Sequence, residues 1–317
     1  MTTLITGGAG FIGSHVAQQL LADGETVVVL DNFNDYYDPS IKRANAAHLE
    51  ESPKATIIEG DVRDAELVEK IFAEQGIRRV THLAAMAGVR SSVNQAQLYM
   101  DVNLMGTLNL LEAARKHSVE VFVLASTSSV YGETQQIPFR EDDPADRVLA
   151  AYPASKRSAE ILAHTYTNLW GLNVTVLRFF NVYGPSGRPD MMPLRLMQSI
   201  SSGEEITIFN GGDVLRDWTY IDDTVNGVIA ALKRPMGYEV INLGVGAPIS
   251  LNEFIEVIEE LAGKKAHRVD VPKPPSDPPI TYCDNSRARE LLGFDPQVKM
   301  VDGLAKTWAW FCEVQSI

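Results

Sequence analysis

The chain has 317 residues, of which 45% are hydrophobic and 22% are charged, a composition that is ordinary for a globular enzyme. The formal net charge of −13 and the sequence pI of about 4.9 argue against binding to nucleic acid or to anionic membranes, because like charges repel at long range. No apolar run approaches the ~20 residues that a membrane-spanning helix needs. We therefore expect a soluble protein with no nucleic-acid or membrane partner.

Between residue 2 and about residue 180, short apolar runs alternate with amphipathic stretches, which is typical of a parallel sheet covered by helices. The expected strands are 2–6, 26–30, 55–59, 79–83, 121–125 and 173–178. The expected helices lie near 11–22, 40–49, 64–74, 92–117 and 151–170, and a long loop is expected over 31–45. This order predicts an α/β fold with a doubly wound parallel Rossmann sheet.

After residue 181 the pattern becomes irregular. A loop over 183–189 precedes a helix that ends near residue 201, and a capping box at 250–253 opens a helix that ends near residue 263. The proline-rich segment 272–279 cannot be regular structure. The segments 217–221 and 239–243 are strand-like and are candidates for a return to the main sheet.

These segments predict two domains, the second of them discontinuous. Residues 1–180 plus about 217–244 are expected to form the Rossmann domain. Residues from about 181 to 216 plus 245–317 are expected to form a smaller α/β domain that binds the substrate.

A glycine-rich turn joins the first expected strand to the first helix, with the spacing G-x-x-G-x-x-G over Gly7, Gly10 and Gly13. Glycine lets the backbone approach a pyrophosphate closely, and the helix N-terminus offers free N–H groups and a positive dipole end. Glycines alone are weak evidence, since tight turns between strand and helix use them without a ligand.

Two carboxylates at strand ends strengthen the nucleotide interpretation. Asp31 closes the second strand, where it can accept hydrogen bonds from the adenosine ribose and would repel a 2′-phosphate. No arginine or lysine follows it before Lys42, which favours NAD over NADP. Asp61 ends the third strand, where the adenine should lie; the alternative for Asp61 is a helix N-cap.

Tyr152 and Lys156 stand four residues apart at the start of the helix 151–170, so they share one face. A neighbouring ammonium and the positive nicotinamide ring are expected to lower the pKa of the phenol from about 10. The phenolate could then take a proton from a sugar hydroxyl. The hydroxyls of 126–129 follow the fifth strand, at the edge where ligands bind in such sheets, and Thr127 could hold the reacting oxygen; the alternative is a polar end to the strand.

Seven motifs together resemble one family over essentially the full length of the chain, the NAD-dependent epimerase/dehydratase family of extended short-chain dehydrogenases/reductases. The motifs are Gly7 to Gly13, Asp31-Asn32, His82 to Ala85, Ser126 to Gly132, Tyr152 to Lys156, Arg178 to Asn181 and Arg216-Asp217. Within the family the chain is most similar to UDP-glucuronate 4-epimerases, on the segments 31–39, 87–92 and 178–191.

The resemblance implies a catalytic set of Thr127, Tyr152 and Lys156, bound NAD and a UDP-sugar substrate. The expected NAD contacts are Gly7, Gly10, Phe11, Ile12, Gly13, Asp31, Asn32, Asp61, Val62, Leu83, Ala84, Ala85, Asn103, Tyr152, Lys156 and Phe180. The expected substrate contacts are Arg90, Thr127, Ser129, Asn181, Arg188 and Arg216.

Residues beside Thr127 separate the branches of this family. A 4,6-dehydratase needs an acid/base pair there, and UDP-glucuronate decarboxylases carry a glutamate at the position of Ser129. This chain has Ser128-Ser129, and neither hydroxyl can shuttle protons near neutral pH. A 4-epimerase needs firm phosphate contacts and a loosely held sugar, which fits Arg90 and Arg216 together with small hydroxyls.

A uronate substrate would pass through a β-keto acid that tends to lose CO₂. Arg188 is our candidate for holding the carboxylate out of the orientation that favours this loss; the alternative is an arginine that braces its loop. Asn181 departs from the uronate epimerases, which have threonine there, and asparagine is usual in neutral-sugar epimerases. UDP-glucose/UDP-galactose 4-epimerase therefore stays open, as do a net reductase and a non-enzymatic NAD-sensing protein.

Remaining features concern metals, location and assembly. The six histidines show no paired spacing, so no metal is expected, and Cys283 and Cys312 are interpreted as reduced thiols. The chain begins with a strand-like segment and not a signal peptide, which favours a cytoplasmic location. Helices 92–117 and 151–170 carry apolar residues away from the site, which predicts a homodimer built on a four-helix bundle. These residues are Leu104, Leu108, Leu111, Ile161, Leu162 and Leu169.

Overall fold

The computed structural model describes residues 1–272 and 280–315, and its centre is a seven-stranded sheet in the order β10-β6-β5-β4-β1-β2-β3. All neighbouring strands in it are parallel. Its strands are β1 (Thr2–Thr6), β2 (Thr26–Asp31), β3 (Ala55–Glu59), β4 (Arg79–His82), β5 (Val121–Thr127), β6 (Val174–Phe179) and β10 (Tyr238–Leu243). The doubly wound parallel fold expected from the sequence is confirmed.

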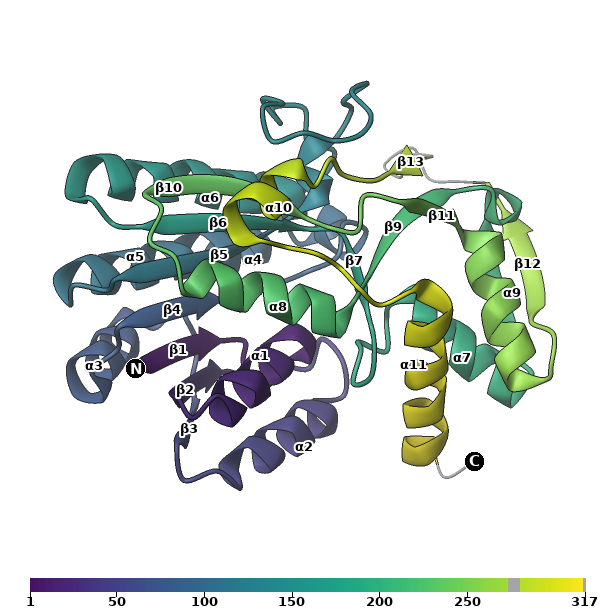
Figure 1. Cartoon of the computed structure of the whole chain (residues 1–317), viewed down its shortest axis with the longest axis horizontal. Helices are drawn as coiled ribbons and strands as arrows, with labels where there is room; N and C mark the ends of the chain where they lie inside the picture. Colours follow the sequence, from purple (N-terminus) through teal and green to yellow (C-terminus); the bar gives the residue numbers. More distant parts are fainter. Residues whose placement is uncertain (273–279, 316–317) are drawn as a thin grey trace.

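Helices cover both faces of this sheet (Figure 1). On one face lie α1 (Phe11–Ala22), α2 (Pro39–Glu50) and α8 (Ile221–Leu232), and on the other lie α3 (Ala65–Gln75), α4 (Ala96–Met100), α5 (Gly106–Lys116) and α6 (Ala151–Trp170). Fully buried apolar side chains fill each interface, such as Val16 of α1 on the first face and Leu110 of α5 on the second. The strand order reverses at β1, between β2 and β4, so the carboxyl ends of these strands open onto a crevice where such sheets bind ligands.

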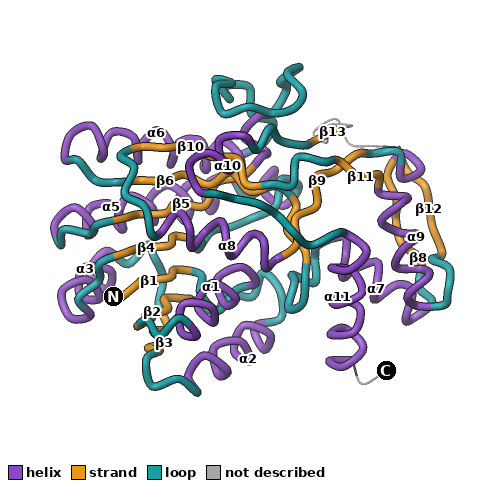
Figure 2. The backbone as a smooth tube through the Cα atoms, in the orientation of Figure 1, coloured by secondary structure: helices purple, strands orange, loops and turns teal. Residues whose placement is uncertain are grey.

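The remaining strands form smaller sheets beside the large one (Figure 2). In one of them β9 (Leu215–Tyr220) pairs with β7 (Asn181–Tyr183), β11 (Pro248–Ser250) and β13 (Ile280–Thr281), and in the other β8 (Glu205–Phe209) pairs with β12 (His267–Val271). The helices of this part are α7 (Met192–Ser202), α9 (Leu251–Ala262), α10 (Ser286–Leu292) and α11 (Met300–Gln315). The expected capping box is present, since Ser250 Oγ accepts a hydrogen bond from the backbone N–H of Glu253 at 3.0 Å.

The two strand-like segments after residue 210 have different outcomes. The segment 239–243 corresponds to β10 and joins the main sheet beside β6, as expected. The segment 217–221 is also largely a strand, β9, as expected. The expectation that it returns to the main sheet was wrong, because β9 pairs with β7 and β11 in the smaller sheet. Its partner β7 begins at Asn181, two residues after Phe179, where β6 ends.

Two further expectations need correction. The loop after β2 is shorter than 31–45, because Asp38 accepts a hydrogen bond from the backbone N–H of Ser40 and α2 begins at Pro39, a favoured first helical residue. The expected helix 92–117 is broken into the 3₁₀ turn Ser91–Asn94, α4, a π-helical turn over Asp101–Met105, and α5. The proline-rich segment 272–279 lies outside the described residues except for Pro272.

Within residues 1–272 and 280–315, no helix is long and apolar enough to cross a bilayer. The same residues contain no cluster of three or more histidine, cysteine or acidic side chains that could hold a metal ion.

Candidate functional site

A cavity of about 420 Å³ opens at the carboxyl ends of the main strands. Nineteen of the residues expected at the site line it. They are Gly7, Gly10, Phe11, Ile12, Gly13, Asp31, Asn32, Asp61, Val62, Leu83, Ala84, Ala85, Thr127, Ser129, Tyr152, Lys156, Phe180, Asn181 and Arg188. They come from the first 60% or so of the chain, so the fold brings together segments that are far apart in sequence.

The glycine turn closes tightly between β1 and α1. Gly7 has a φ of 68°, in the left-handed region that favours glycine, and the backbone N–H of Gly10 donates to its carbonyl at 3.1 Å. A Cβ on Gly13 would lie 2.2 Å from the Gly7 carbonyl oxygen, so no side chain fits there. Gly10 caps α1 without a side chain, which leaves N–H groups of the first helical turn facing the cavity for an anion.

Asp31 ends β2 with a carboxylate that is almost fully buried. It accepts hydrogen bonds from the backbone N–H groups of Ala9, at 3.1 Å, and Phe33, at 2.9 Å. Burial raises the pKa of Asp31, while these hydrogen bonds and the charge of Lys42 act in the opposite direction. Each carboxylate oxygen keeps a further lone pair, which fits a ribose diol at this position.

Asp61 is held by the side chains around it. It accepts hydrogen bonds from Asn32 Nδ2 at 2.9 Å and from Arg63 Nη2 at 2.8 Å, and these bonds, chiefly those from Arg63, lower its pKa to about 2. The N-cap of the next helix, α3, is Asp64, because its side chain accepts a hydrogen bond from the backbone N–H of Leu67. The alternative considered for Asp61 is therefore wrong.

Thr127 and Tyr152 meet at the centre of the cavity. Thr127, at the end of β5, accepts a hydrogen bond from the backbone N–H of Ser129 at 3.1 Å and lies 3.2 Å from Ser129 Oγ. Tyr152 is half-buried, and burial raises its pKa, whereas a hydrogen bond with Thr127 and the charge of Arg188 lower it. We expected Lys156 to lower this pKa, but burial is the largest influence on it, and the lowering influences come from Thr127 and Arg188.

Lys156 is almost completely buried, and burial lowers its pKa to about 8. The negative charge of Glu160 acts in the opposite direction. Among the described residues, Lys156 Nζ has no hydrogen-bond partner, although it borders the cavity. A buried ammonium with three free N–H donors is costly unless a ligand supplies acceptors, and ribose hydroxyls are acceptors of this kind.

Arg188 reaches the cavity from the loop after β7, but its guanidinium is already paired. Its Nε and Nη2 donate to the two oxygens of Asp190 at 3.0 and 2.6 Å. Its guanidinium lies 5.4 Å from the centre of the Tyr36 ring, and Asn181 lines the same part of the cavity. The bidentate pair fixes the plane of Arg188 and leaves Nη1 for a further acceptor.

Three expected contacts lie outside the cavity lining. Asn103 is fully buried in the π-helical turn, where its amide bonds to both backbone groups of Met86 and to Ser155 Oγ. Arg90 lies 4.3 Å from the centre of the Phe209 ring, and Arg216 Nη1 donates to the carbonyl of Leu215 at 2.9 Å.

The sequence analysis missed several residues that line the cavity, among them Tyr36, Tyr37 and Lys42. Lys42 Nζ donates to the carbonyl and side-chain oxygens of Asn34 at 2.9 and 2.7 Å, so its charge is held by the loop after β2. The aromatic pair in that loop was a usable signal, because two adjacent tyrosines in a loop that follows a strand end favour a contact role. Nothing in the sequence indicated that Lys42 turns inward.

The glycine turn after β1, the buried carboxylate of Asp31 and the Tyr152–Lys156 pair are the arrangement expected of a Rossmann enzyme of the short-chain dehydrogenase/reductase type. The model of the NAD dependent epimerase/dehydratase family matches residues 3–244, and the chain belongs to this family. A UDP-glucuronate 4-epimerase of Thermodesulfobacterium geofontis is 44% identical over 97% of this chain and 95% of its own length.

Two solved structures are similar over nearly the whole chain. UDP-glucuronic acid 4-epimerase of Bacillus cereus, in complex with UDP-glucuronic acid and NAD, is 36% identical with a TM-score of 0.93 and covers 99% of this chain and 100% of its own. UDP-glucose 4-epimerase of Thermotoga maritima, with UDP-glucose, is 32% identical with a TM-score of 0.91 and has the same coverage of 99% and 100%.

Proposed function

We propose that this chain is an NAD-dependent UDP-sugar 4-epimerase that interconverts UDP-glucuronate and UDP-galacturonate. The observation that carries the proposal is that Thr127, Tyr152 and Lys156 line one cavity together with Arg188, whose charge acts on Tyr152. The similarity to UDP-glucuronate 4-epimerases at up to 44% identity supports the same substrate.

The described residues fit a resident NAD. The turn at Gly7–Gly13 would hold the pyrophosphate, Asp31 the adenosine ribose, and Lys156 the ribose next to the nicotinamide. When bound, NAD would supply the acceptor for the hydride that leaves C4 of the sugar and the source of the hydride that is returned to the opposite face of that carbon. The cofactor is regenerated in each turnover, so it need not leave the protein.

Tyr152 is the proposed acid/base. It takes the proton of the C4 hydroxyl as that carbon is oxidised and gives it back after the sugar has turned. Thr127 bonds to the phenol and would orient the reacting oxygen, while the buried charge of Lys156 favours the phenolate. Because the same three residues serve both directions, a single site is sufficient for epimerisation.

Ser128 and Ser129 decide between branches of the family. Both line the cavity beside Thr127, where a dehydratase needs an acid/base pair and a decarboxylase a glutamate. A serine hydroxyl is neither acid nor base near neutral pH, so the 4-keto sugar is expected to survive until it is reduced again.

Arg188 is the proposed carboxylate contact. Its Nη1 remains available beside the bidentate pair with Asp190, and the pair would prevent the guanidinium from following the carboxylate as it rotates. Arg90 and Arg216 are the proposed phosphate contacts, although neither lines the cavity, and binding would require their side chains to turn toward it.

A neutral hexose is the second candidate substrate, and Asn181 is the observation that favours it. Incubating the enzyme with UDP-glucuronate and, separately, with UDP-glucose and following the anomeric signals by NMR tests both. We expect UDP-galacturonate from the first substrate and little or no UDP-galactose from the second. Efficient conversion of UDP-glucose alone would contradict the uronate assignment, and conversion of neither would contradict the epimerase assignment.

A homodimer is also proposed. Large apolar side chains remain exposed on the two helices expected to pair: Ile161 and Leu169 of α6, at 54% and 62%, and Met105 at the start of α5, at 46%. Leu111 does not belong to this surface, because it is fully buried in the core. Exposed apolar groups of this size favour burial against a second copy.

A further inference from the structure

Glu160 lies one helical turn beyond Lys156 on α6, and its side chain has no exposed surface. Its carboxylate accepts two hydrogen bonds from Arg178 of β6, from Nε at 3.1 Å and from Nη2 at 2.8 Å. It also accepts from Ser126 Oγ at the end of β5 and from Arg157 Nη1 at 3.0 Å. One buried carboxylate thus joins a helix to the ends of two neighbouring strands.

Each partner of Glu160 stands close to a residue proposed for the reaction. Ser126 directly precedes Thr127, and Arg178 precedes Phe180 by two residues. The three segments that form the catalytic part of the cavity are therefore connected through Glu160.

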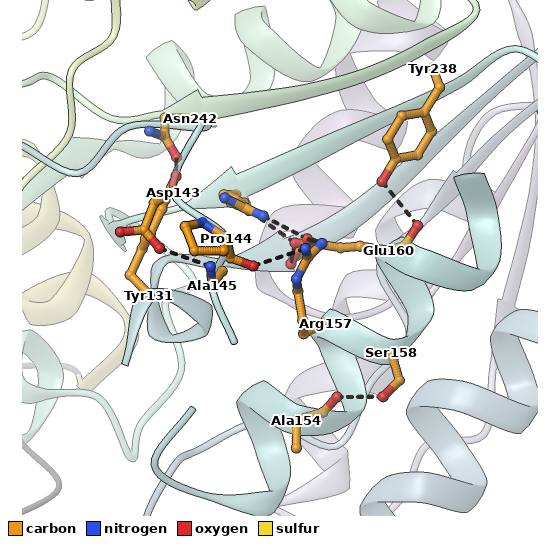
Figure 3. A network of polar contacts seen from close by, with 12 residues as sticks. Tyr131, Asp143, Pro144, Ala145, Ala154, Arg157, Ser158, Glu160, Tyr238 and Asn242 are labelled. Carbon is orange, nitrogen blue, oxygen red and sulfur yellow. Dashed lines mark hydrogen bonds and ion pairs between the residues drawn. The ribbon is translucent and has the colours of Figure 1, made fainter. Parts of the chain in front are cut away.

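Further hydrogen bonds hold Glu160 and its partner Arg157 from two sides (Figure 3). Arg157 Nη2 donates to the carbonyl of Pro144 at 3.0 Å, and the hydroxyl of Tyr238, on the edge strand β10, donates to the backbone carbonyl of Glu160 at 2.9 Å. The Arg178 guanidinium lies 4.8 Å from the centre of the Tyr131 ring. The position of the carboxylate is thus fixed by the helix, the sheet and the loop before the helix.

The negative charge of Glu160 also acts on Lys156. His82 of β4 faces Lys156 from the sheet, and burial together with the charge of Lys156 lowers the pKa of this histidine well below its usual range, so it is neutral. Burial raises the pKa of Tyr152, so its phenol carries no charge near neutral pH. Glu160 is therefore the anion that offsets the burial of the ammonium, while Arg178 and Arg157 compensate part of its charge.

We propose that Glu160, held by Arg178, is a positioning residue of this enzyme that aligns Lys156 with the ends of β5 and β6 and maintains its positive charge. The inference rests on the proposed function. A buried ion pair is rarely a net gain in stability, so its presence here is better explained by the alignment and charge of the site.

Glu160→Gln tests the charge while preserving the shape and one acceptor oxygen. Lys156 is required in its protonated form, so activity is present below its pKa and is lost above it. Without the carboxylate of Glu160 the pKa of Lys156 falls. The alkaline limb of the plot of kcat against pH should then move to lower pH by about one unit. The KM for the UDP-sugar should change less than kcat, because Glu160 does not touch the substrate.

The double variant Glu160→Gln with Arg178→Gln is the matched control. It removes both charges of the buried pair, so Arg178 is not left buried without its partner, while Arg157 loses a partner but is partly exposed. The double variant should therefore fold even if the single variant does not. Glu160 is the charged side chain that acts on the pKa of Lys156. Removing the positive charge of Arg178 as well should offset part of its loss, so the alkaline limb should lie between those of wild type and the single variant. Glu160→Asp, which keeps the charge, should restore the wild-type limb at least in part.

A readout without turnover completes the test. Each protein is dialysed between pH 7 and pH 10, and the NAD that remains bound is quantified by chromatography. Retention should fall at lower pH in Glu160→Gln than in wild type, because Lys156 would contact the ribose. An alkaline limb and a retention profile that both match wild type in the folded variants would overturn the proposal. A wild-type protein that retains NAD with the expected pH dependence but converts no UDP-sugar would contradict the proposed function and not this one.

Discussion

Tyr152 and Lys156 show how burial prepares two side chains for one reaction. Burial disfavours the charged form of each, raising the pKa of the phenol and lowering that of the ammonium to about 8. The two pKa values therefore move apart, from ordinary values of 10.0 for the phenol and 10.5 for the ammonium. A positively charged nicotinamide beside the phenol would act against burial and favour the phenolate, so the acid/base function is expected to depend on the bound cofactor.

Tyr152→Phe removes the proton acceptor and leaves the ring in its contact with Tyr99, whose centroid is 6.1 Å away. We expect kcat to fall by at least ~10²-fold, in the range typical of the loss of a general base. Bound NAD, measured after protein denaturation, should equal that of wild type. Activity close to wild type would show that another residue is the base.

Arg188→Ala tests the substrate at the scale of one side chain. Loss of a charge-assisted hydrogen bond costs about 1.5–3 kcal/mol, so turnover of UDP-glucuronate should fall much further than any turnover of UDP-glucose. A freed carboxylate would also reach the orientation that favours CO₂ loss, and a UDP-pentose should appear among the products. Both are measured by NMR.

Asp190→Asn is a useful companion to that variant. It weakens the bidentate pair that fixes Arg188 but leaves the guanidinium in place. We expect a smaller effect than for Arg188→Ala on the same two substrates. Equal losses on both sugars in Arg188→Ala, without pentose, would mean that Arg188 braces its loop and would favour the neutral-sugar epimerase.

Among the elements, the turn between β1 and α1 followed most directly from sequence. A strand, three spaced glycines and a helix are local information, and each glycine answers a local steric demand. The break within the segment 92–117 could not be predicted from sequence. It includes the π-helical turn Asp101–Met105, where the side-chain amide of Asn103 bonds to Met86 and Ser155, which are distant in sequence. Periodicity along one segment cannot reveal such a contact.

Gly13→Ala tests the turn. Its Cβ would lie 2.2 Å from the Gly7 carbonyl oxygen, which forces the backbone apart at the proposed pyrophosphate site. We expect a loss of roughly 1–3 kcal/mol in the free energy of unfolding and little bound NAD in the purified protein. Gly10→Ala, whose Cβ would lie 3.2 Å from the same oxygen, is the control and should have the milder effect in both thermal melting and NAD content.

At the scale of the whole molecule, the exposed apolar side chains of α6 and of Met105, the residue before α5, predict a dimer. Light scattering at micromolar concentration should give twice the chain mass of 34.9 kDa. Ile161→Glu should shift the protein toward the monomer, because a carboxylate would be buried in the interface. Val301→Glu changes an equally exposed apolar residue on α11 and should leave the mass unchanged. A monomeric wild-type protein would contradict the dimer.

The main sheet and the central part of the site could be predicted because their signals lie in short segments. Each strand is one apolar run, parallel strands end at one edge, and Thr127, Tyr152 and Lys156 all follow strands or begin helices at that edge. Where β9 pairs could not be predicted, because a strand-like run does not specify its neighbours. The inward turn of Lys42 and the pairing of Arg188 with Asp190 were likewise hidden.

The sequence by itself determined the fold class and the positions of the main strands along the chain, and it indicated the residues proposed to carry the chemistry, since local propensity, spacing and strand ends are sufficient for these. Only the tertiary structure decided which side chains compensate one another. Ser126 and Arg178 lie 34 and 18 residues from Glu160 along the chain, and the three meet because β5, β6 and α6 pack side by side. Buried charges acquire their partners from packing, and packing is a property of the whole folded chain.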